Sequence, residues 1–340
     1  MGRYITKRLL QAIPTMFIIS LVLFVLTQNI GDPVTTMGGR DPIRPDDYER
    51  LRTELGLDQP IYLQYVYWMI GNDWTKVDVG GKEILGTRKG ILRGDFGTSL
   101  MDRVPVMELV WSRVPNTLLL MIPAQIIIIL FGVSIGIYSA LKQYSLMDNI
   151  LTAGSFIGLS MPVFFISLIL IYVFSVLFQH WGLPHLPAVG MFEPAVGKTP
   201  LQVAIHMIMP VTSIAFISIA SYSRFMRSSM LNIMNQDYIR TAKAKGLEKT
   251  YVILVHALKN AALPIVTLMG MDLPLLLAGA VVTESIFGWP GMGRLFLDHL
   301  EGSDGPVVMA IVILVALAVI LFQILTDLIY ALLDPRIRMD

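Results

Sequence analysis

Cysteine is absent from the 340-residue chain, and charged side chains make up only 15% of it. Without cysteine the chain cannot form disulfides, thiolate zinc sites or iron–sulfur clusters. A soluble domain carries about 25% charged residues, so this low charge, with 54% hydrophobic residues, indicates side chains that face something other than water. The 26 lysines and arginines nearly balance the 25 aspartates and glutamates, which argues against nucleic acid as a partner.

Motifs that carry catalysis or bind a metal are also lacking. None of the five histidines stands in His-Glu-x-x-His spacing, and no Gly-x-Ser-x-Gly elbow occurs. Gly197-Lys198-Thr199 resembles the end of a phosphate-binding P-loop, but Phe192 occupies the position of its first glycine. The sequence therefore predicts no catalytic residue, cofactor or metal site, and we expect that this chain is not an enzyme.

Six apolar segments are long enough to cross a bilayer, which takes roughly 20 helical residues. They cover residues 9–30, 117–141, 150–178, 203–221, 263–287 and 307–333. The first is longer than the apolar core of a signal peptide and no cleavage site follows it, which favours a retained anchor. We predict an all-α polytopic membrane protein with about six transmembrane helices.

The distribution of basic residues predicts the orientation of these helices. Thirteen lysines and arginines lie on the side of the N-terminus, whereas the opposite short connections hold only Lys198 and Arg294. Both termini are therefore predicted to be cytoplasmic, in a plasma (inner) membrane. The long segment 31–116 would then be extracytoplasmic, with helices at 48–55 and 61–70, strands at 75–79 and 82–85, and an amphipathic helix at 105–113.

The connection between the fourth and fifth spans, residues 224–260, carries seven basic and two acidic residues. It is too polar to span and too rich in helix formers to be a flexible linker. We predict two short helices broken near Gly246-Leu247, which suits docking into a groove on a cytoplasmic partner. Contact with anionic lipid would explain the charge alone.

Ionisable and small residues within the apolar segments also indicate function. A charge at mid-bilayer costs about 3 kcal/mol, so Asp272, Glu284 and Asp327 should face a cavity or a partner helix. We predict that Asp272 and Glu284 line a substrate path. Gly132-x-x-x-Gly136 and Gly154-x-x-x-Gly158 are spaced for close helix packing.

Several stretches match motifs of a known family. They are Leu55-Gly56-Leu57-Asp58-Gln59-Pro60, Gly94-Asp95-Phe96-Gly97-Thr98-Ser99-Leu100, Pro115-Asn116-Thr117-Leu118, Asp237-Tyr238-Ile239-Arg240-Thr241-Ala242-Lys243-Ala244-Lys245-Gly246-Leu247 and Glu284-Ser285-Ile286-Phe287-Gly288-Trp289-Pro290-Gly291-Met292-Gly293. The chain resembles the membrane-spanning permease subunit of an ABC-type importer, in the dipeptide/oligopeptide branch. The general importer loop begins Glu-Ala-Ala where this chain has Arg240-Thr241-Ala242, a change usual for the peptide branch, and about twenty residues around 72–90 resemble an insertion.

The resemblance implies the type I importer permease fold. Residues 1–111 would form an N-terminal region with the first span and the extracytoplasmic segment, and residues 112–334 the permease domain with its ATPase-coupling loop at 224–260. The coupling residues would be Arg240, Thr241, Ala242, Lys243, Ala244, Lys245, Gly246 and Leu247.

The resemblance also implies ATP-driven import of peptides or a related small solute. The partners would be a second permease subunit, two cytoplasmic ATPase subunits that bind ATP and magnesium, and an extracytoplasmic solute-binding protein. The solute stays open among dipeptides, oligopeptides, nickel complexes, glutathione and oligosaccharides. The alternative is a secondary transporter with an ion-coupled midplane site, which would need matched repeats with broken helices.

The orientation can be tested with single cysteines, because the chain has none of its own. An impermeant thiol reagent added to intact cells should label a cysteine at Thr75, in the predicted outer segment, and should not label one at Thr250. Labelling after lysis is the control for reactivity. The reverse pattern would overturn the orientation.

Overall fold

The computed structural model describes residues 2–28, 56–79, 82–86, 88–274 and 278–333, together with five residues between 44 and 53. Among these described residues, five helices are long and apolar enough to cross a membrane, and the helix pair Lys249–Ala261 and Leu263–Asp272, bent by 47°, is a sixth candidate. The predicted all-α polytopic class with about six spans is confirmed.

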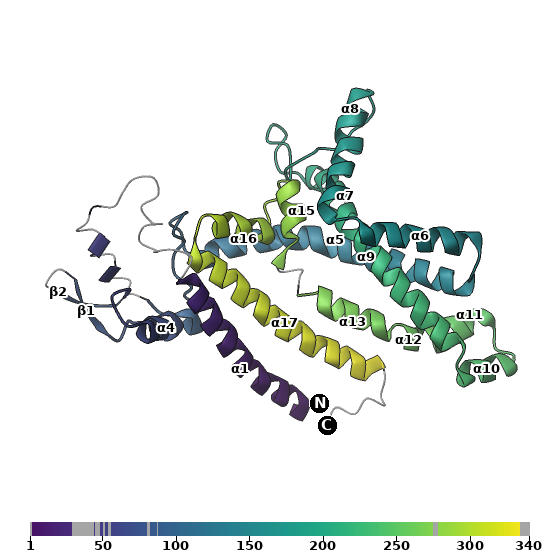
Figure 1. The fold of residues 1–340 in the computed structure, drawn as a ribbon, viewed down its shortest axis with the longest axis horizontal. Helices are drawn as coiled ribbons and strands as arrows, with labels where there is room; N and C mark the ends of the chain where they lie inside the picture. The colour runs from purple at the N-terminus through teal and green to yellow at the C-terminus, as the bar shows by residue number, and fades with distance from the viewer. Residues whose placement is uncertain are drawn as a thin grey trace. The chain divides into compact units, whose positions relative to one another are not determined.

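The helices of Figure 1 follow one another along the whole described chain. They are α1 Gly2–Thr27, α4 Ile61–Ile70, α5 Val106–Leu141, α6 Leu146–Ser160, α7 Val163–Leu170, α8 Phe178–His180, α9 Pro200–Met234, α10 Asp237–Ala244, α11 Lys249–Tyr251, α12 Leu258–Ala261, α13 Leu263–Asp272, α15 Val281–Ile286, α16 Met292–Glu301 and α17 Gly305–Leu333. The chain divides into two compact units, described separately below. The first holds residues 1–8, 116–294 and 318–340, and the second holds residues 9–115 and 295–317.

The predicted outer elements are present where the structure describes them. Strands β1 Lys76–Val79 and β2 Lys82–Leu85 pair antiparallel, with Lys76 opposite Leu85. Helix α4 begins after Pro60, as predicted. The helix predicted at 48–55 lies partly outside the described residues. The amphipathic helix predicted at 105–113 is not separate, because α5 runs without a break from Val106 into the second span.

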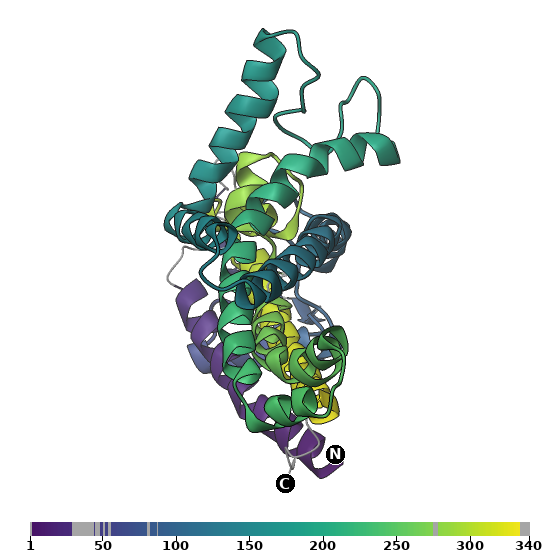
Figure 2. The ribbon, with the colours of Figure 1, turned by 90° about the vertical axis from the view of Figure 1, so that its right-hand side faces the viewer.

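The prediction of one continuous third span at residues 150–178 is wrong. Met161 is extended, with φ −91° and ψ 127°, and Pro162 caps a new helix. A residue that precedes proline is pushed out of the helical region, so this span separates into α6 and a second rod. That rod runs from α7 through a π-helical segment, Ile171–Leu177, into α8 (Figure 2).

The fourth and fifth spans also differ from their predicted limits. Helix α9 continues to Met234, well beyond residue 221, although Pro210 lies inside it. The fifth span, predicted at 263–287, is not one helix: α13 ends at Asp272, just before Pro274, and α15 begins at Val281. Proline at 274 cannot donate the backbone hydrogen bond that would continue α13.

Close packing of α5 against α9 organises the first unit. A Cβ atom added at Gly132 would lie 2.6 Å from Cβ of Tyr222, and one added at Gly136 would lie 2.5 Å from Cβ of Met226. Only glycine allows this approach, so the predicted packing role of this pair is confirmed. Gly154 is different, because a Cβ there meets nothing within 4 Å.

Helices α1 and α17 run antiparallel, as one contact in each unit shows. In the first unit Arg8 forms an ion pair with Asp327, with N and O atoms 3.1 Å apart. In the second unit the Thr27 hydroxyl donates to the Met309 sulfur at 3.3 Å. Asp327 therefore has a partner helix, one of the two environments expected for it.

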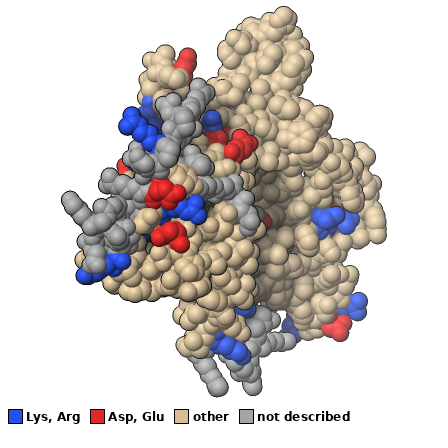
Figure 3. Space-filling view, turned by 60° about the vertical axis from the view of Figure 1, so that its left-hand side comes forward, with Lys and Arg blue, Asp and Glu red and all other residues tan. Residues whose placement is uncertain are grey.

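Large apolar side chains remain exposed along these helices, as a membrane protein requires. Ile126 and Leu130 on α5 are both 59% exposed, and Leu321 on α17 is 64% exposed. In the space-filling view of Figure 3, uncharged atoms cover most of the visible face and the charged side chains form small groups. We interpret the uncharged surface as facing lipid or partner subunits.

The α5–α9 contact predicts a contrast between two glycines. Gly136→Leu should lower the free energy of unfolding of the purified chain by about 1–3 kcal/mol or prevent its insertion into the membrane, because the new side chain has no space. Gly154→Leu is the matched control, since it adds the same side chain on a helix surface that is open. Thermal unfolding in detergent measures both, and equal stability of the two variants would contradict the packing assignment.

Candidate functional site

The predicted coupling loop forms a helix, a glycine turn and a second helix. Helix α10 ends at Ala244, and Gly246 follows with φ +77°. The amide of Gly246 donates to the carbonyl of Lys243 at 3.0 Å, and that of Leu247 donates to the carbonyl of Ala242 at 3.4 Å. This is a Schellman motif, which needs a left-handed residue that glycine adopts without strain. The predicted break near Gly246-Leu247 is confirmed.

The two faces of α10 differ in burial. Ile239 and Ala242 are 0% and 8% exposed and belong to a core with Val252, Ile253 and Ala257. The remaining predicted coupling residues are exposed: Arg240, Thr241, Lys243, Ala244, Lys245, Gly246 and Leu247. Ala242 was expected to seat in a partner's groove, but its side chain packs within this chain. The surface open to a partner is therefore the basic, outward face of α10 and its glycine turn.

A side-chain hydrogen bond joins α10 to α12, which follows the glycine turn further along the chain. The Asn260 side-chain amide donates to the Tyr238 hydroxyl at 2.9 Å, which joins α12 to α10. Within the helix, the Thr241 hydroxyl donates to the Asp237 carbonyl at 2.9 Å. These bonds and the shared core hold the exposed face in a fixed shape, so a force on it passes to the helices behind it.

Asp272 ends a hydrogen-bonded chain that crosses three helices. The Tyr222 hydroxyl on α9 donates to its Oδ2 at 2.6 Å, and Gln125 on α5 donates to the same hydroxyl oxygen at 3.2 Å. Tyr222 is 2% exposed, while Asp272 is half-buried. Sequence reasoning named Asp272 and missed Tyr222 and Gln125. The glycine spacing on α5 was the available signal, since Gly132 lies against Tyr222.

Glu284 is fully buried, and donors of this chain bind both of its carboxyl oxygens. The Thr117 hydroxyl donates to Oε1 and the Arg294 amide to Oε2, both at 3.0 Å. Thr117 also accepts from the Met292 amide at 2.7 Å. The carboxyl group therefore joins the start of the second span to the start of α16. The substrate-path role of Glu284 stays a prediction, and its contacts support a structural task.

The loop between α15 and α16, residues 287–291, is bound to the residues that lead into the second span at further points. The Trp289 indole donates to the Asn116 carbonyl and the Asn116 side chain donates to the Pro290 carbonyl, each at 2.9 Å. A Cβ added at Gly291 would lie 2.4 Å from the Glu284 carboxyl. Two motifs that are far apart in sequence, around Asn116 and around Gly291, are thus held together by hydrogen bonds within the first unit.

The second unit contains another buried acid that sequence reasoning missed, and only one of its carboxyl oxygens accepts hydrogen bonds. Asp304 is 0% exposed, and its Oδ2 accepts from the Ser99 hydroxyl at 2.6 Å and from the Met101 amide at 3.1 Å. His299 lies beside it and contacts Asp102 at 3.1 Å. The available signal was the motif that ends at Ser99-Leu100, which now has a structural explanation: it binds the start of α17.

The arrangement has the marks of a membrane permease rather than an enzyme. Apolar helices are broken at prolines, the carboxyl groups of Asp272 and Glu284 lie within the bundle, and a basic turn is exposed. Among the described residues no group of three or more histidines and acids could hold a metal ion.

Comparison with known proteins identifies the family. Residues 132–339 match the binding-protein-dependent transport system inner membrane component, and residues 1–121 match the N-terminal part of such components. The chain belongs to this family. It is a multi-pass inner-membrane permease subunit of an ABC-type transport system and not a catalytic subunit.

Three relatives are similar over nearly their whole length. The oligopeptide transport system permease protein AppB of Bacillus subtilis is 38% identical, over 99% of this chain and 100% of that protein. The dipeptide transport system permease protein DppB of Escherichia coli is also 38% identical, with 99% of each chain covered. The glutathione transport system permease protein GsiC of Escherichia coli is 35% identical, again with 99% of each covered.

Replacing the carboxyl group by an amide should change the stability of the chain differently at the two acids of the fifth span, Asp272 and Glu284. Glu284→Gln replaces one accepting oxygen by an amino group that faces a backbone or hydroxyl donor, which costs about 1–3 kcal/mol when buried. Asp272→Asn is the matched control, because its carbonyl can still accept from Tyr222. Thermal unfolding of the purified chain should show the larger loss for Glu284→Gln. A larger loss for Asp272→Asn would contradict the assignment of Glu284 to the loop.

Proposed function

We propose that this chain is the permease subunit of an ATP-driven importer for peptides or a related small solute. The observation that carries the proposal is full-length similarity to three permeases whose names specify oligopeptides, dipeptides and glutathione. All three solutes are short peptides. The missing catalytic and metal motifs agree with a chain that carries the path and leaves ATP hydrolysis to other subunits.

We infer four kinds of partner for the assembled importer. A second, distinct permease subunit would complete the path, two cytoplasmic ATPase subunits would bind ATP and magnesium, and an extracytoplasmic solute-binding protein would deliver the solute. The basic-residue asymmetry supports cytoplasmic placement of both termini and of α10. Residues 1–111 and 112–334 would then divide the chain into an N-terminal region and the permease domain.

The outward face of α10 and its turn would be the mechanical link to an ATPase subunit. Lys243, Lys245 and Arg240 are exposed and can meet acidic side chains on that subunit. Ile239 and Ala242 fix the same helix to the chain's own core. ATP binding in the ATPase subunits would favour one of two positions of this helix. The resulting shift between the two conformations of the permease cannot exceed the difference in ATP's binding free energy to them.

Asp272 would lie on the translocation path. It is half-buried at the end of α13, and among the described residues only Tyr222 donates to its carboxyl group. An acid in this position can attract a cationic group of the solute, such as the amino terminus of a peptide. Glu284 would shape the outer end of the path by fixing the loop over it. Asp272→Asn should accordingly reduce transport while the complex still assembles.

The coupling role can be tested with two matched glycines. Gly246→Val forces a β-branched residue into a left-handed conformation that costs about 1 kcal/mol or more, and should detach the ATPases or abolish solute-stimulated ATP hydrolysis. Gly197→Val is the control, because Gly197 also has positive φ and open space around its Cβ position but lies in the predicted outer connection. Co-purification and ATPase assays of the complex provide the readouts.

A second variant distinguishes loss of coupling to the ATPase subunits from misfolding of α10 and its glycine turn. Ala244→Trp adds bulk to an exposed position, whereas the same change at Ala242 would disrupt the chain's own core. Ala244→Trp should uncouple the ATPases while the chain keeps its thermal stability. Wild-type coupling in both Gly246→Val and Ala244→Trp would show that this surface does not bind the ATPase.

A further inference from the structure

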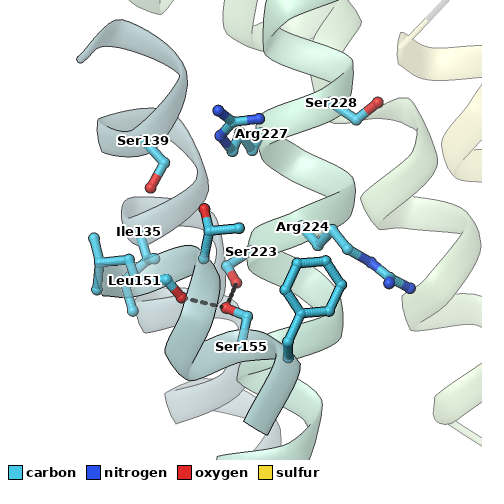
Figure 4. Close-up of a pocket in the computed structure, with 10 residues that line it drawn as sticks. Ile135, Ser139, Leu151, Ser155, Ser223, Arg224, Arg227 and Ser228 are labelled. Carbon is cyan, nitrogen blue, oxygen red and sulfur yellow. Dashed lines mark hydrogen bonds between the residues drawn. The ribbon is translucent and has the colours of Figure 1, made fainter. Parts of the chain in front are cut away.

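A pocket of about 170 Å³ that is lined by both polar and apolar side chains lies between α5, α6 and α9 (Figure 4). Its lining combines two arginines, five hydroxyl side chains and three apolar side chains: Arg224, Arg227, Ser139, Thr152, Ser155, Ser223, Ser228, Ile135, Leu151 and Phe156. All of these residues belong to the first unit. Neither the coupling surface nor the hydrogen-bonded chain that ends at Asp272 uses the pocket.

The charges of the pocket leave a net positive site. Arg227 donates Nε and Nη2 to the two carboxyl oxygens of Asp148, at 2.9 and 2.8 Å. This pair lowers the pKa of Asp148, which is also bound by the Tyr144 amide. Arg224 is exposed and has no ion pair among the described residues. One guanidinium charge therefore stays uncompensated beside a neutralised pair.

Hydroxyl groups also line the pocket. The Ser155 and Ser223 hydroxyl oxygens lie 3.4 Å apart, as one dashed line in Figure 4 shows, and they also donate to the Leu151 and Ala220 carbonyls at 2.8 and 3.1 Å. Ser139 is 3% exposed, and neither it nor Ser228 makes a side-chain hydrogen bond within the described part of the chain. Arg227 uses only two of its five N–H donors on Asp148. The donors that the pocket can offer to an anion are thus Arg224, the remaining N–H groups of Arg227 and the Ser139 and Ser228 hydroxyls.

The position of the pocket favours a phospholipid headgroup as the source of such an anion. Ser139 lies near the end of α5, Leu151 near the start of α6, and Arg224 within the last turns of α9. This is the end of the helices that the basic residues predict to be cytoplasmic, at the level where phospholipid phosphates lie. Phe156 is 55% exposed and Ile150, next to the lining, is 54% exposed, so acyl chains can continue along the outside of α6.

We propose that this pocket binds the phosphate group of an anionic phospholipid from the cytoplasmic leaflet. The headgroup lies between Arg224 and the hydroxyls of α5 and α9, and its acyl chains follow the apolar surface of α6. The lipid thereby fills the space where the α5–α6 hairpin meets α9. This site would adjust the packing of α9, the helix that leads into α10, to the lipid composition of the membrane.

The test is retention of lipid by the purified complex, measured by native mass spectrometry. Wild type should retain phosphatidylglycerol in preference to phosphatidylcholine with the same acyl chains. Arg224→Gln should weaken that retention about fivefold, the fold-change that one basic residue near anionic lipid provides. Ser228→Leu, at an exposed position, should weaken it by narrowing the pocket. Lys142→Gln is the matched control, because Lys142 lies at the same end of α5 outside the lining and should leave retention unchanged.

Three outcomes would overturn the proposal. The first is wild-type retention in both pocket variants, as expected if a partner subunit's side chain fills the pocket. The second is an equal loss in Lys142→Gln, which would show attraction to the surface charge alone. The third is displacement of the bound lipid by inorganic phosphate, which would make a soluble phosphate the ligand.

Discussion

The approach of α5 to α9 at Gly132 and Gly136 is the constraint on which the rest of the first unit depends. Helices in a membrane gain little from the hydrophobic effect against each other, so they associate where small residues let their backbones come close. This contact brings Tyr222 to Gln125 and Asp272. It also sets the width of the pocket beside Arg224 and the core on which α10 rests. Side chains at the two glycine positions would separate all three features at once.

Polar groups inside the bundle are satisfied in two different ways. Both carboxyl oxygens of the buried Glu284 accept hydrogen bonds, from Thr117 and Arg294, whereas the buried Asp304 accepts through Oδ2 only. Asp272 keeps one donor and partial exposure. A carboxyl group that is enclosed by this chain's own side chains fixes a structure, whereas a partly exposed carboxyl group with a single donor can still bind another group. This contrast separates acids that hold the bundle together from the acid proposed to meet the solute.

From the sequence we predicted the all-α polytopic class, the approximate position of the spans, the outer β-hairpin and the helix break at Gly246. These features depend on hydropathy, on turn residues and on glycine conformation, which can be read over short stretches of sequence. The sequence did not predict where the spans break. Pro162 and Pro274 interrupt apolar runs whose composition is uniform, whereas Pro210 lies inside an unbroken helix. Which proline breaks a helix depends on neighbours that re-satisfy the backbone, and these are tertiary. The partners of Asp272 and Glu284, and the inward position of Ala242, required knowledge of which helices meet.

Helix α9 has 35 residues and is therefore about 50 Å long at 1.5 Å per residue. A bilayer core is about 30 Å thick, so this single helix extends well past the hydrocarbon and ends two residues before α10. The exposed face of α10 would then stand beyond the lipid headgroups, where the proposed ATPase partner can reach it, and a small tilt at one end of α9 would become a larger displacement at the other. Because no break interrupts α9 between Tyr222 and Met234, a tilt of this helix would move the Tyr222 hydroxyl and the chain end that leads into α10 together.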